Sequence, residues 1–263
     1  MAILVFFVGT IALVMCSIEA GYRLGCLEHR RSNQEKESPV SAIEGSVLAL
    51  LAFMLAFTFG IASNRLDARK ELVRSEANTI RTVWYRSDFL PDPDGAEARK
   101  LLREYVDARA TAFQSADGER VTRVVGEAER TQGRLWAMAV AHAREDMPSD
   151  IGALYLESLN EMFAVHASRV AMGLQMRIPP GIWLTLAVLT VLGMVMVGYQ
   201  AGIAESRRTL AMPILAVAFA CVVALISSLD QPIGGFTLTQ VSQQPLIDLL
   251  SDLDSQRLPH PSN

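Results

Sequence analysis

The stretch AFTFGIASNRLDARKELVRSEANTI, Ala56 to Ile80, is the part of the sequence that indicates the fold most clearly. It begins as a membrane-like apolar run and becomes highly charged within a few residues, and no Pro interrupts it. Apolar residues nevertheless recur at spacings that keep them on one helical face. They are Ala62, Leu66, Val73, Ala77, Ile80 and Trp84. The pattern predicts one uninterrupted helix from about Val47 to past Val73, which leaves the bilayer and packs its apolar face on a helical layer.

Four apolar runs are long enough to cross a bilayer core, which needs roughly 17 to 25 helical residues. They cover 1–18, 47–62, 181–199 and 210–229, and none contains Asp, Glu, Lys, Arg or His. The second run is short alone, but the helix described above extends it. The first run lacks a preceding Lys or Arg and a small-residue cleavage site, so we interpret it as a retained membrane helix rather than a signal peptide.

Composition separates the chain into two environments and excludes several classes of protein. Of its 263 residues, 51% are hydrophobic and 20% are charged, and the net charge of −4 carries no nucleic-acid signature. Cys16, Cys26 and Cys221 have no spacing typical of a disulfide framework or a zinc site. His142 and His166 could meet across a helix bundle, although ordinary core or surface histidines are the simpler interpretation. No motif for nucleotide binding, metal binding or catalysis is present, so we expect no cofactor, no metal and no enzyme activity.

The segment between the second and third apolar runs predicts a layer of helices, because apolar residues recur there at helical spacing. After the long helix, which ends near Trp84, we expect helices over about 97–115, 119–145 and 149–176, with Ser149 as a possible N-cap. Near the C-terminus, Pro245 suits a first helical position. A short amphipathic helix is predicted after it, with one apolar face made of Leu246, Ile247, Leu249, Leu250 and Leu253.

Two stretches resemble the bestrophin-like family of bacterial membrane proteins. The first, Glu44 to Pro91, carries the family pieces Glu44-Gly45, Phe57 and Phe59, Asp67-Ala68-Arg69, Glu76-Ala77-Asn78 and Leu90-Pro91. The second, Ser227 to Leu250, carries Asp230-Gln231-Pro232, Gly234-Gly235 and the helix opening at Pro245. The resemblance covers nearly the whole chain in order.

The resemblance implies an all-α fold with four transmembrane helices and a helical cytosolic domain inserted between helices 2 and 3. It divides the chain into helices 1 and 2 (1–64), the cytosolic domain (65–178), helices 3 and 4 (179–230) and a tail (231–263). Bestrophin anion channels, to which the family is similar, are pentamers whose second helix lines a neck. In those channels the second helix leaves the membrane through an aromatic-rich motif, which matches Arg65 to Arg69 here. Both tryptophans of the motif are missing, and Asn64 stands where an arginine usually precedes them.

The function implied by the resemblance is a pentameric ion channel for chloride or another small anion, with the lipid bilayer and copies of itself as partners. Arginine and lysine counts on the two sides of the spans are nearly equal, so charge does not set the orientation. The resemblance places the helical domain and both termini in the cytosol, as a multi-pass protein of the cell (inner) membrane. The alternative is a membrane-anchored helical scaffold or sensor without conduction, and a membrane enzyme is a distant third.

Site residues follow from the second span and its extension. Leu48, Ala52 and Ala56 share a charge-free face that would suit a pore gated by dewetting, although small residues serve helix packing equally well. Phe53 and Phe57, one turn apart, are expected to pack against neighbouring helices.

The polar residues that follow the second span on the same helix allow two interpretations. They form either a cytosolic mouth or ordinary interhelical ion pairs and hydrogen bonds, and the second interpretation is favoured. This set comprises Arg65, Asp67, Arg69, Glu76 and Asn78. Asp67 and Arg69 lie two residues apart, so they are expected to pair with other helices or other subunits. Asp230 directly follows the last span and is expected either to cap the loop or to bind backbone there, and Gly198 and Gly202 are expected to permit close helix approach.

Overall fold

The protein is all-α in the computed structural model, which describes residues 2–31, 37–112, 118–145, 150–204, 210–231 and 240–255. No strand occurs within these ranges. The eight α-helices are α1 (Ala2–Arg31), α2 (Glu37–Arg86), α3 (Asp94–Ala112), α4 (Gly118–Glu145), α5 (Asp150–Val170), α6 (Pro180–Ile203), α7 (Ala211–Asp230) and α8 (Gln244–Ser255). A 3-10 turn, η1 (Ser87–Phe89), follows α2, and a π-helical turn, η2 (Ala171–Gln175), follows α5.

Among the residues that the structure describes, four helices are long and apolar enough to cross a membrane, as the apolar runs predict. These candidate spans are Leu4–His29, Val40–Phe89, Pro180–Ile203 and Ala211–Asp230. The predicted uninterrupted helix is present as α2, whose 50 residues contain no break between Val47 and Val73. No Pro lies between Val47 and Val73, so the backbone hydrogen-bond ladder stays intact across the change from apolar to charged sequence.

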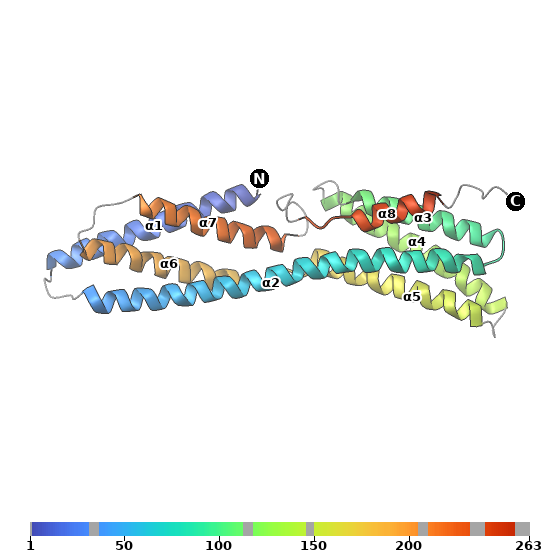
Figure 1. Ribbon diagram of the computed structural model, residues 1–263, viewed down its shortest axis with the longest axis horizontal. Helices are drawn as coiled ribbons and strands as arrows, with labels where there is room; N and C mark the ends of the chain where they lie inside the picture. The colour runs from blue at the N-terminus through green and yellow to red at the C-terminus, as the bar shows by residue number, and fades with distance from the viewer. Residues whose placement is uncertain are drawn as a thin grey trace. The chain divides into compact units, whose positions relative to one another are not determined.

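The chain divides into two compact units, and α2 contributes residues to both. Unit 1 comprises residues 1–65 and 177–231, and unit 2 comprises 66–176 and 232–263. Figure 1 shows α1, α6 and α7 together with the first half of α2, and α3, α4, α5 and α8 with its second half.

Glycines bring α1 and α6 into backbone contact in unit 1. A Cβ added at Gly198 would lie 2.0 Å from the carbonyl oxygen of Ile18, and one at Gly202 would lie 2.5 Å from that of Tyr22. The close approach predicted for this pair is therefore confirmed. A second pair on α1, Gly21 with Gly25, does the same against α6, where the Cβ of Gly21 would lie 2.0 Å from the Val195 carbonyl oxygen. Helices in lipid gain dispersion contacts when small residues allow such an approach.

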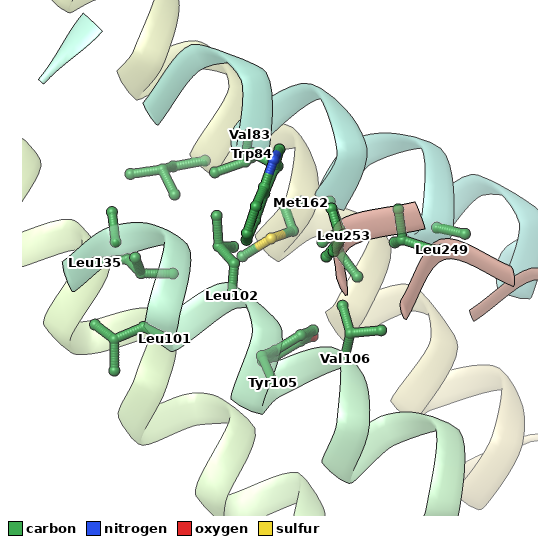
Figure 2. Packing of buried hydrophobic residues seen from close by; sticks show 14 of the residues in the cluster. Val83, Trp84, Leu101, Leu102, Tyr105, Val106, Leu135, Met162, Leu249 and Leu253 are labelled. Atoms are coloured by element: carbon green, nitrogen blue, oxygen red, sulfur yellow. The ribbon is translucent and has the colours of Figure 1, made fainter. Parts of the chain in front are cut away.

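Unit 2 is built around the apolar face of α2 predicted from the sequence. Val73, Ala77, Ile80 and Trp84 are buried there, together with apolar residues from the other helices of this unit. Figure 2 shows this core, in which α3 presents Leu101, Leu102, Tyr105 and Val106 and α8 presents Leu249 and Leu253. The charged half of α2 therefore packs in unit 2 through an apolar stripe that runs between its ionic residues.

Helix α8 packs within unit 2, on a narrower face than predicted. Leu246, Leu249 and Leu253 are buried, whereas Ile247 is 38% exposed. One residue turns a helix by about 100°, so Ile247 falls beside the face that Leu246 and Leu249 share. The predicted helix bounds also shift: α3 begins three residues early and α5 ends at Val170, while the predicted end at residue 115 lies outside the described residues. Ser149, the predicted N-cap, lies outside the described residues.

Candidate functional site

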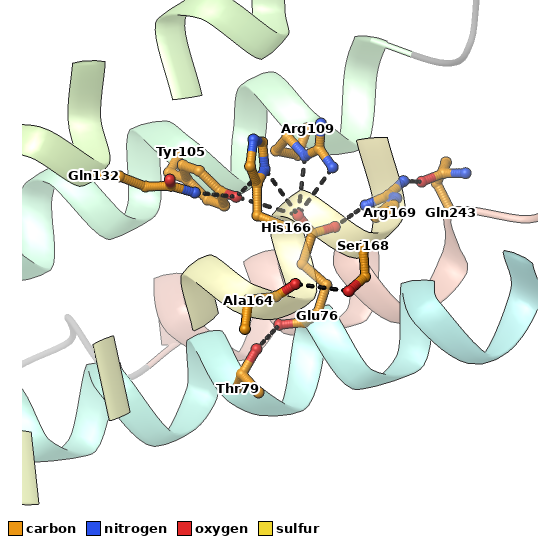
Figure 3. Close-up of polar contacts among 10 residues, drawn as sticks. All are labelled: Glu76, Thr79, Tyr105, Arg109, Gln132, Ala164, His166, Ser168, Arg169 and Gln243. Carbon is orange, nitrogen blue, oxygen red and sulfur yellow. Dashed lines mark hydrogen bonds and ion pairs between the residues drawn. The ribbon is translucent and has the colours of Figure 1, made fainter. Parts of the chain in front are cut away.

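A wholly buried carboxylate, Glu76 of α2, is the centre of a polar cluster inside unit 2 (Figure 3). Its Oε1 accepts hydrogen bonds from Arg109 Nε at 3.1 Å and from the Tyr105 hydroxyl at 3.2 Å. Its Oε2 forms an ion pair with Arg169. Because both oxygens are bonded to donors from other helices, the charge is compensated in a place where an unpaired carboxylate would be very unfavourable.

The two arginines come from different helices and are themselves buried. Arg109 of α3 is 1% exposed and Arg169 of α5 is 7% exposed. Loss of hydration lowers the pKa of the Arg109 guanidinium, and burial lowers the pKa of Arg169 to about 10. Arginine side chains stay protonated in proteins, so these two guanidiniums and the Glu76 carboxylate together carry a formal charge of +1. Arg169 also donates to the side-chain oxygen of Gln243, in the segment that leads into α8.

Tyr105 and His166 extend the cluster to further helices. The Tyr105 hydroxyl lies 3.0 Å from His166 Nδ1 of α5 and accepts a hydrogen bond from Gln132 Nε2 of α4 at 3.5 Å. Burial raises the pKa of Tyr105. Burial, reinforced by the Arg109 charge, lowers the pKa of His166 to about 4, so the imidazole is neutral at pH 7. The cluster therefore joins α2, α3, α4, α5 and the segment before α8 through neutral and ionic hydrogen bonds.

A second polar contact, in unit 1, joins α7 to α2 and to the residues just before α6. Asp230, the last residue of α7, accepts a hydrogen bond from the backbone N–H of Ile178 at 2.9 Å. The same oxygen lies 3.5 Å from Arg65 Nη1 of α2. Ile178 directly precedes α6, so one carboxylate ties α2, α6 and α7 together. The predicted backbone contact of Asp230 is confirmed, and Arg65 forms an interhelical ion pair.

The remaining predicted polar residues of α2 are distributed around the helix. Asp67 is exposed and pairs with Lys70 at 3.0 Å on the same helix, rather than with another helix, because a side chain three residues on is within reach. Arg69 is buried at 6% exposure. Asn78 is exposed, since two residues turn the helix by about 200° away from Glu76. Only Glu76 of this predicted set enters the buried cluster.

The three residues of the predicted pore face on α2 differ in their burial within the single chain. Leu48 contacts α6, where its Cδ2 lies 3.2 Å from the position a Cβ would take on Gly193. Ala52 and Ala56 are exposed in the single chain. Phe53 and Phe57 stack on each other with centroids 6.5 Å apart and are also exposed, so within this chain they do not pack on neighbouring helices.

Small residues form an outer stripe on this part of α2. Each lies three or four positions from the next, which keeps the stripe on one side of the helix. The stripe comprises Ala42, Gly45, Ala49, Ala52, Ala56 and Gly60. A Cβ at Gly45 or Gly60 would meet nothing within 4 Å. The spacing of these residues is evident in the sequence, whereas their burial depends on the fold: all are exposed except Gly60, which is half-buried.

The partners of Glu76 were not identified from the sequence. Arg109 and Arg169 resemble the other arginines of charged helices, and nothing in their spacing distinguishes them. Tyr105 lies among apolar residues at helical spacing, so its pattern indicates a core position and not a polar contact. His142 and His166 do not meet, since His142 hydrogen-bonds Asp94 at 2.6 Å while His166 contacts Tyr105.

Comparison with known proteins gives a family match and a fold match. A family model described as the bestrophin-like domain matches residues 11–246. Crystal structures of two mutants of a bacterial bestrophin homologue from Klebsiella pneumoniae are similar to this chain. One has a TM-score of 0.64 at 15% identity, covering 99% of this chain and 100% of that one. The other has a TM-score of 0.62 at 13% identity, covering 96% and 99%.

A third crystal structure, of a mutant membrane protein, has a TM-score of 0.60 at 15% identity and covers both chains completely. No curated protein matches the chain. At these identities the solved structures establish a shared fold, and the activity has to be argued from the site.

Proposed function

Because the chain belongs to the bestrophin-like family, we propose that it forms an ion channel in the cell membrane, as a ring of five identical subunits that conducts chloride or another small anion. The observation that supports this proposal is the exposed small-residue stripe of α2. From Ala49 to Gly60 it lies in the charge-free stretch of a helix that is apolar enough to span a membrane.

Several copies are needed because a single chain offers too few helices to enclose a water-filled path. A closed ring of identical subunits solves this economically. In such a ring, Leu48, Ala52 and Ala56 would face the axis and form an apolar neck, the type of constriction that gates by dewetting. The exposed rings of Phe53 and Phe57 lie on an adjoining side of α2, where a neighbouring copy or lipid would cover them.

Subunit number, anion preference and orientation come from the family resemblance. In this orientation unit 2 and both termini are cytosolic. Arg65, Asp67 and Arg69 follow the charge-free stretch and would lie at the cytosolic mouth, where Asp67 is exposed and Arg65 is held by Asp230. We propose no enzymatic activity for the chain.

Substitution of Ala52 tests the neck directly. Each position occurs once per subunit, so one substitution acts several times around the ring. Ala52→Phe should abolish the current by plugging the neck, and Ala52→Ser should raise it by making the constriction easier to wet. Ala218→Phe is the matched control, because Ala218 is an exposed residue of another candidate span, α7.

The measurement is the current through planar bilayers containing equal amounts of purified protein under a salt gradient. The reversal potential reports the preference for anions, and the mass of the purified assembly reports the number of subunits. Absence of current from the wild type, or a monomeric assembly, would reject the channel. The chain would then be better explained as a membrane-anchored helical scaffold.

A further inference from the structure

One acidic side chain continues the proposed pore face of α2 toward the start of that helix. Glu44 lies four residues before Leu48, and the same step leads on to Ala52 and Ala56. Residues at this spacing form a row that runs along the helix surface at a slight incline. Glu44 therefore follows Leu48 in the row that is proposed to line the neck, about one helical turn away.

Contacts with α6 show at which end of the span Glu44 lies. Leu48 Cδ2 is 3.2 Å from the position a Cβ would take on Gly193, in the second half of α6. The start of α6, by contrast, lies beside Arg65, because the carboxylate of Asp230 bonds both. α6 therefore runs antiparallel to α2, and Glu44 lies one turn further from Arg65 than Leu48 does. In the proposed orientation this end of the row is the outer mouth of the pore.

Glu44 differs from the exposed acidic residues further along α2 in its surroundings. Asp67 pairs with Lys70 at 3.0 Å and Glu71 pairs with Arg74 at 3.5 Å, so these charges cancel locally. Glu44 is half-buried, and among the side chains that the structure describes no cation pairs with it. It is also the one charged residue of α2 between Val40 and Asn64. The outer end of the row thus carries a net negative charge.

We propose that Glu44 is a determinant of ion preference in the proposed channel, where one carboxylate from each subunit forms a negative ring at the outer mouth. This inference rests on the proposed ring of subunits and adds a residue that acts on the permeating ions. A ring of carboxylates attracts cations and repels anions at the entrance of a pore. Glu44 therefore works against the passage of anions, whereas the uncharged neck beyond it excludes ions of either sign when it is dry.

The action of such a ring depends on salt, because counterions screen it. The Debye length falls from about 30 Å at 0.01 M salt to about 3 Å at 1 M. For five carboxylates about 10 Å from the axis, screened Coulomb energies change the local concentration of a monovalent ion roughly four- to tenfold between 0.1 and 0.01 M, and hardly at all above 1 M. Anions are depleted and cations enriched by this factor, so their ratio changes more than either concentration.

Reversal potentials of Glu44→Gln and wild type test the inference. Both are measured in planar bilayers under a potassium chloride gradient of about 0.01 to 0.1 M, and again under one of about 1 to 3 M, where screening is nearly complete. Glu44→Gln should raise the permeability ratio of chloride to potassium about tenfold or more in the dilute gradient and less than about twofold in the concentrated one. The direction of this change is the same whichever ion carries most of the wild-type current.

Two variants separate the charge of Glu44 from its packing. Glu44→Asp keeps the carboxylate and should retain the wild-type ratio in both gradients. Glu19→Gln is the matched control, because it removes a carboxylate from α1 near the same end of the spans, where the adjacent Ile18 lies against Gly198 of α6. Glu19 pairs with Arg23 at 2.8 Å and does not belong to α2, so its loss should change the ratio much less.

The inference would be overturned by an unchanged ratio in conducting Glu44→Gln, by a change of equal size in both gradients, or by equal changes in Glu44→Gln and Glu19→Gln. The mass of the purified assembly checks that each variant forms the ring. Should Glu44→Gln not assemble, the wild type decides: its ratio should rise from the dilute to the concentrated gradient, and a constant ratio would reject the ring. A wild type without current rejects the channel itself and this inference with it.

Discussion

Replacing Glu76 by Gln removes one charge from the buried cluster and changes the side-chain volume little. The carboxylate accepts from Arg109 and Tyr105 through one oxygen and pairs with Arg169 through the other. Gln keeps one acceptor and turns the second into an N–H donor, which must then face a guanidinium or the hydroxyl. Two guanidiniums stay buried without the negative charge that Glu76 supplies.

The size of the effect follows from burial. Removing one partner of a buried ion pair costs about 3–5 kcal/mol, because the other charge stays desolvated. For a protein of this length, each kcal/mol lowers the melting temperature by about 2–4 °C. We therefore expect Glu76→Gln to unfold about 6–20 °C earlier than wild type.

The measurement is thermal unfolding of the detergent-solubilised protein, followed by tryptophan fluorescence. Trp84 reports on unit 2, because it is buried in the same core. Glu71→Gln is the matched control, since Glu71 lies on the same helix and pairs with Arg74 at 3.5 Å while its side chain is 71% exposed. Such an exposed pair contributes about 0–1 kcal/mol, so the control should melt within a few degrees of wild type.

A double variant separates the charge effect from general disruption. Arg169→Gln added to Glu76→Gln removes one of the guanidiniums left uncompensated, so the two losses should be less than additive. Equal melting temperatures for Glu76→Gln and Glu71→Gln would refute the reasoning. Strictly additive losses in the double variant would show that Glu76 and Arg169 do not interact.

Three further changes test other parts of the structure. His166 has a folded-state pKa of about 4 against 6.5 for the free side chain, so the unfolded state binds the proton more tightly. Stability should fall as pH drops from about 6.5 to 4, by roughly 3 kcal/mol in total, and His166→Asn should flatten this slope in unfolding curves recorded across that range. Gly198→Ala should destabilise the detergent-solubilised protein by about 1–3 kcal/mol or more, because its Cβ would meet the α1 backbone, whereas Gly60→Ala should not. Leu249→Ala should cost about 2–5 kcal/mol in thermal unfolding, well above the cost of Ile247→Ala, because Leu249 is wholly buried on α8; equal losses would contradict the packing of α8.

Much of the fold can be predicted from the sequence, because its signals are local. Runs without charge predict the four spans, and the apolar stripe from Ala62 to Trp84 predicts that α2 continues past the second span. The glycine spacing at Gly198 and Gly202 predicts a close helix approach without naming the partner. Each of these inferences uses only helical periodicity and the hydrophobic effect, which act between residues a few positions apart.

The sequence also singled out Glu76 and Asp230 as polar residues beside apolar ones, where burial would require a partner. It did not identify their partners, because these lie far along the chain: Arg169 is 93 residues from Glu76, and Arg65 is 165 residues from Asp230. Several arginines on the charged helices are equivalent by pattern, and only tertiary packing decides which of them is buried.

Local sequence patterns are sufficient to predict which helices are apolar enough to span a membrane, that α2 is continuous, and which of its faces is apolar. The packing of helices against one another is what buries Glu76 between two guanidiniums and leaves Ile247 off the packed face of α8. The physical reason is that periodicity fixes the direction of a side chain around its own helix. The charge, acceptor or empty space that it meets depends on which other helix is brought against that face.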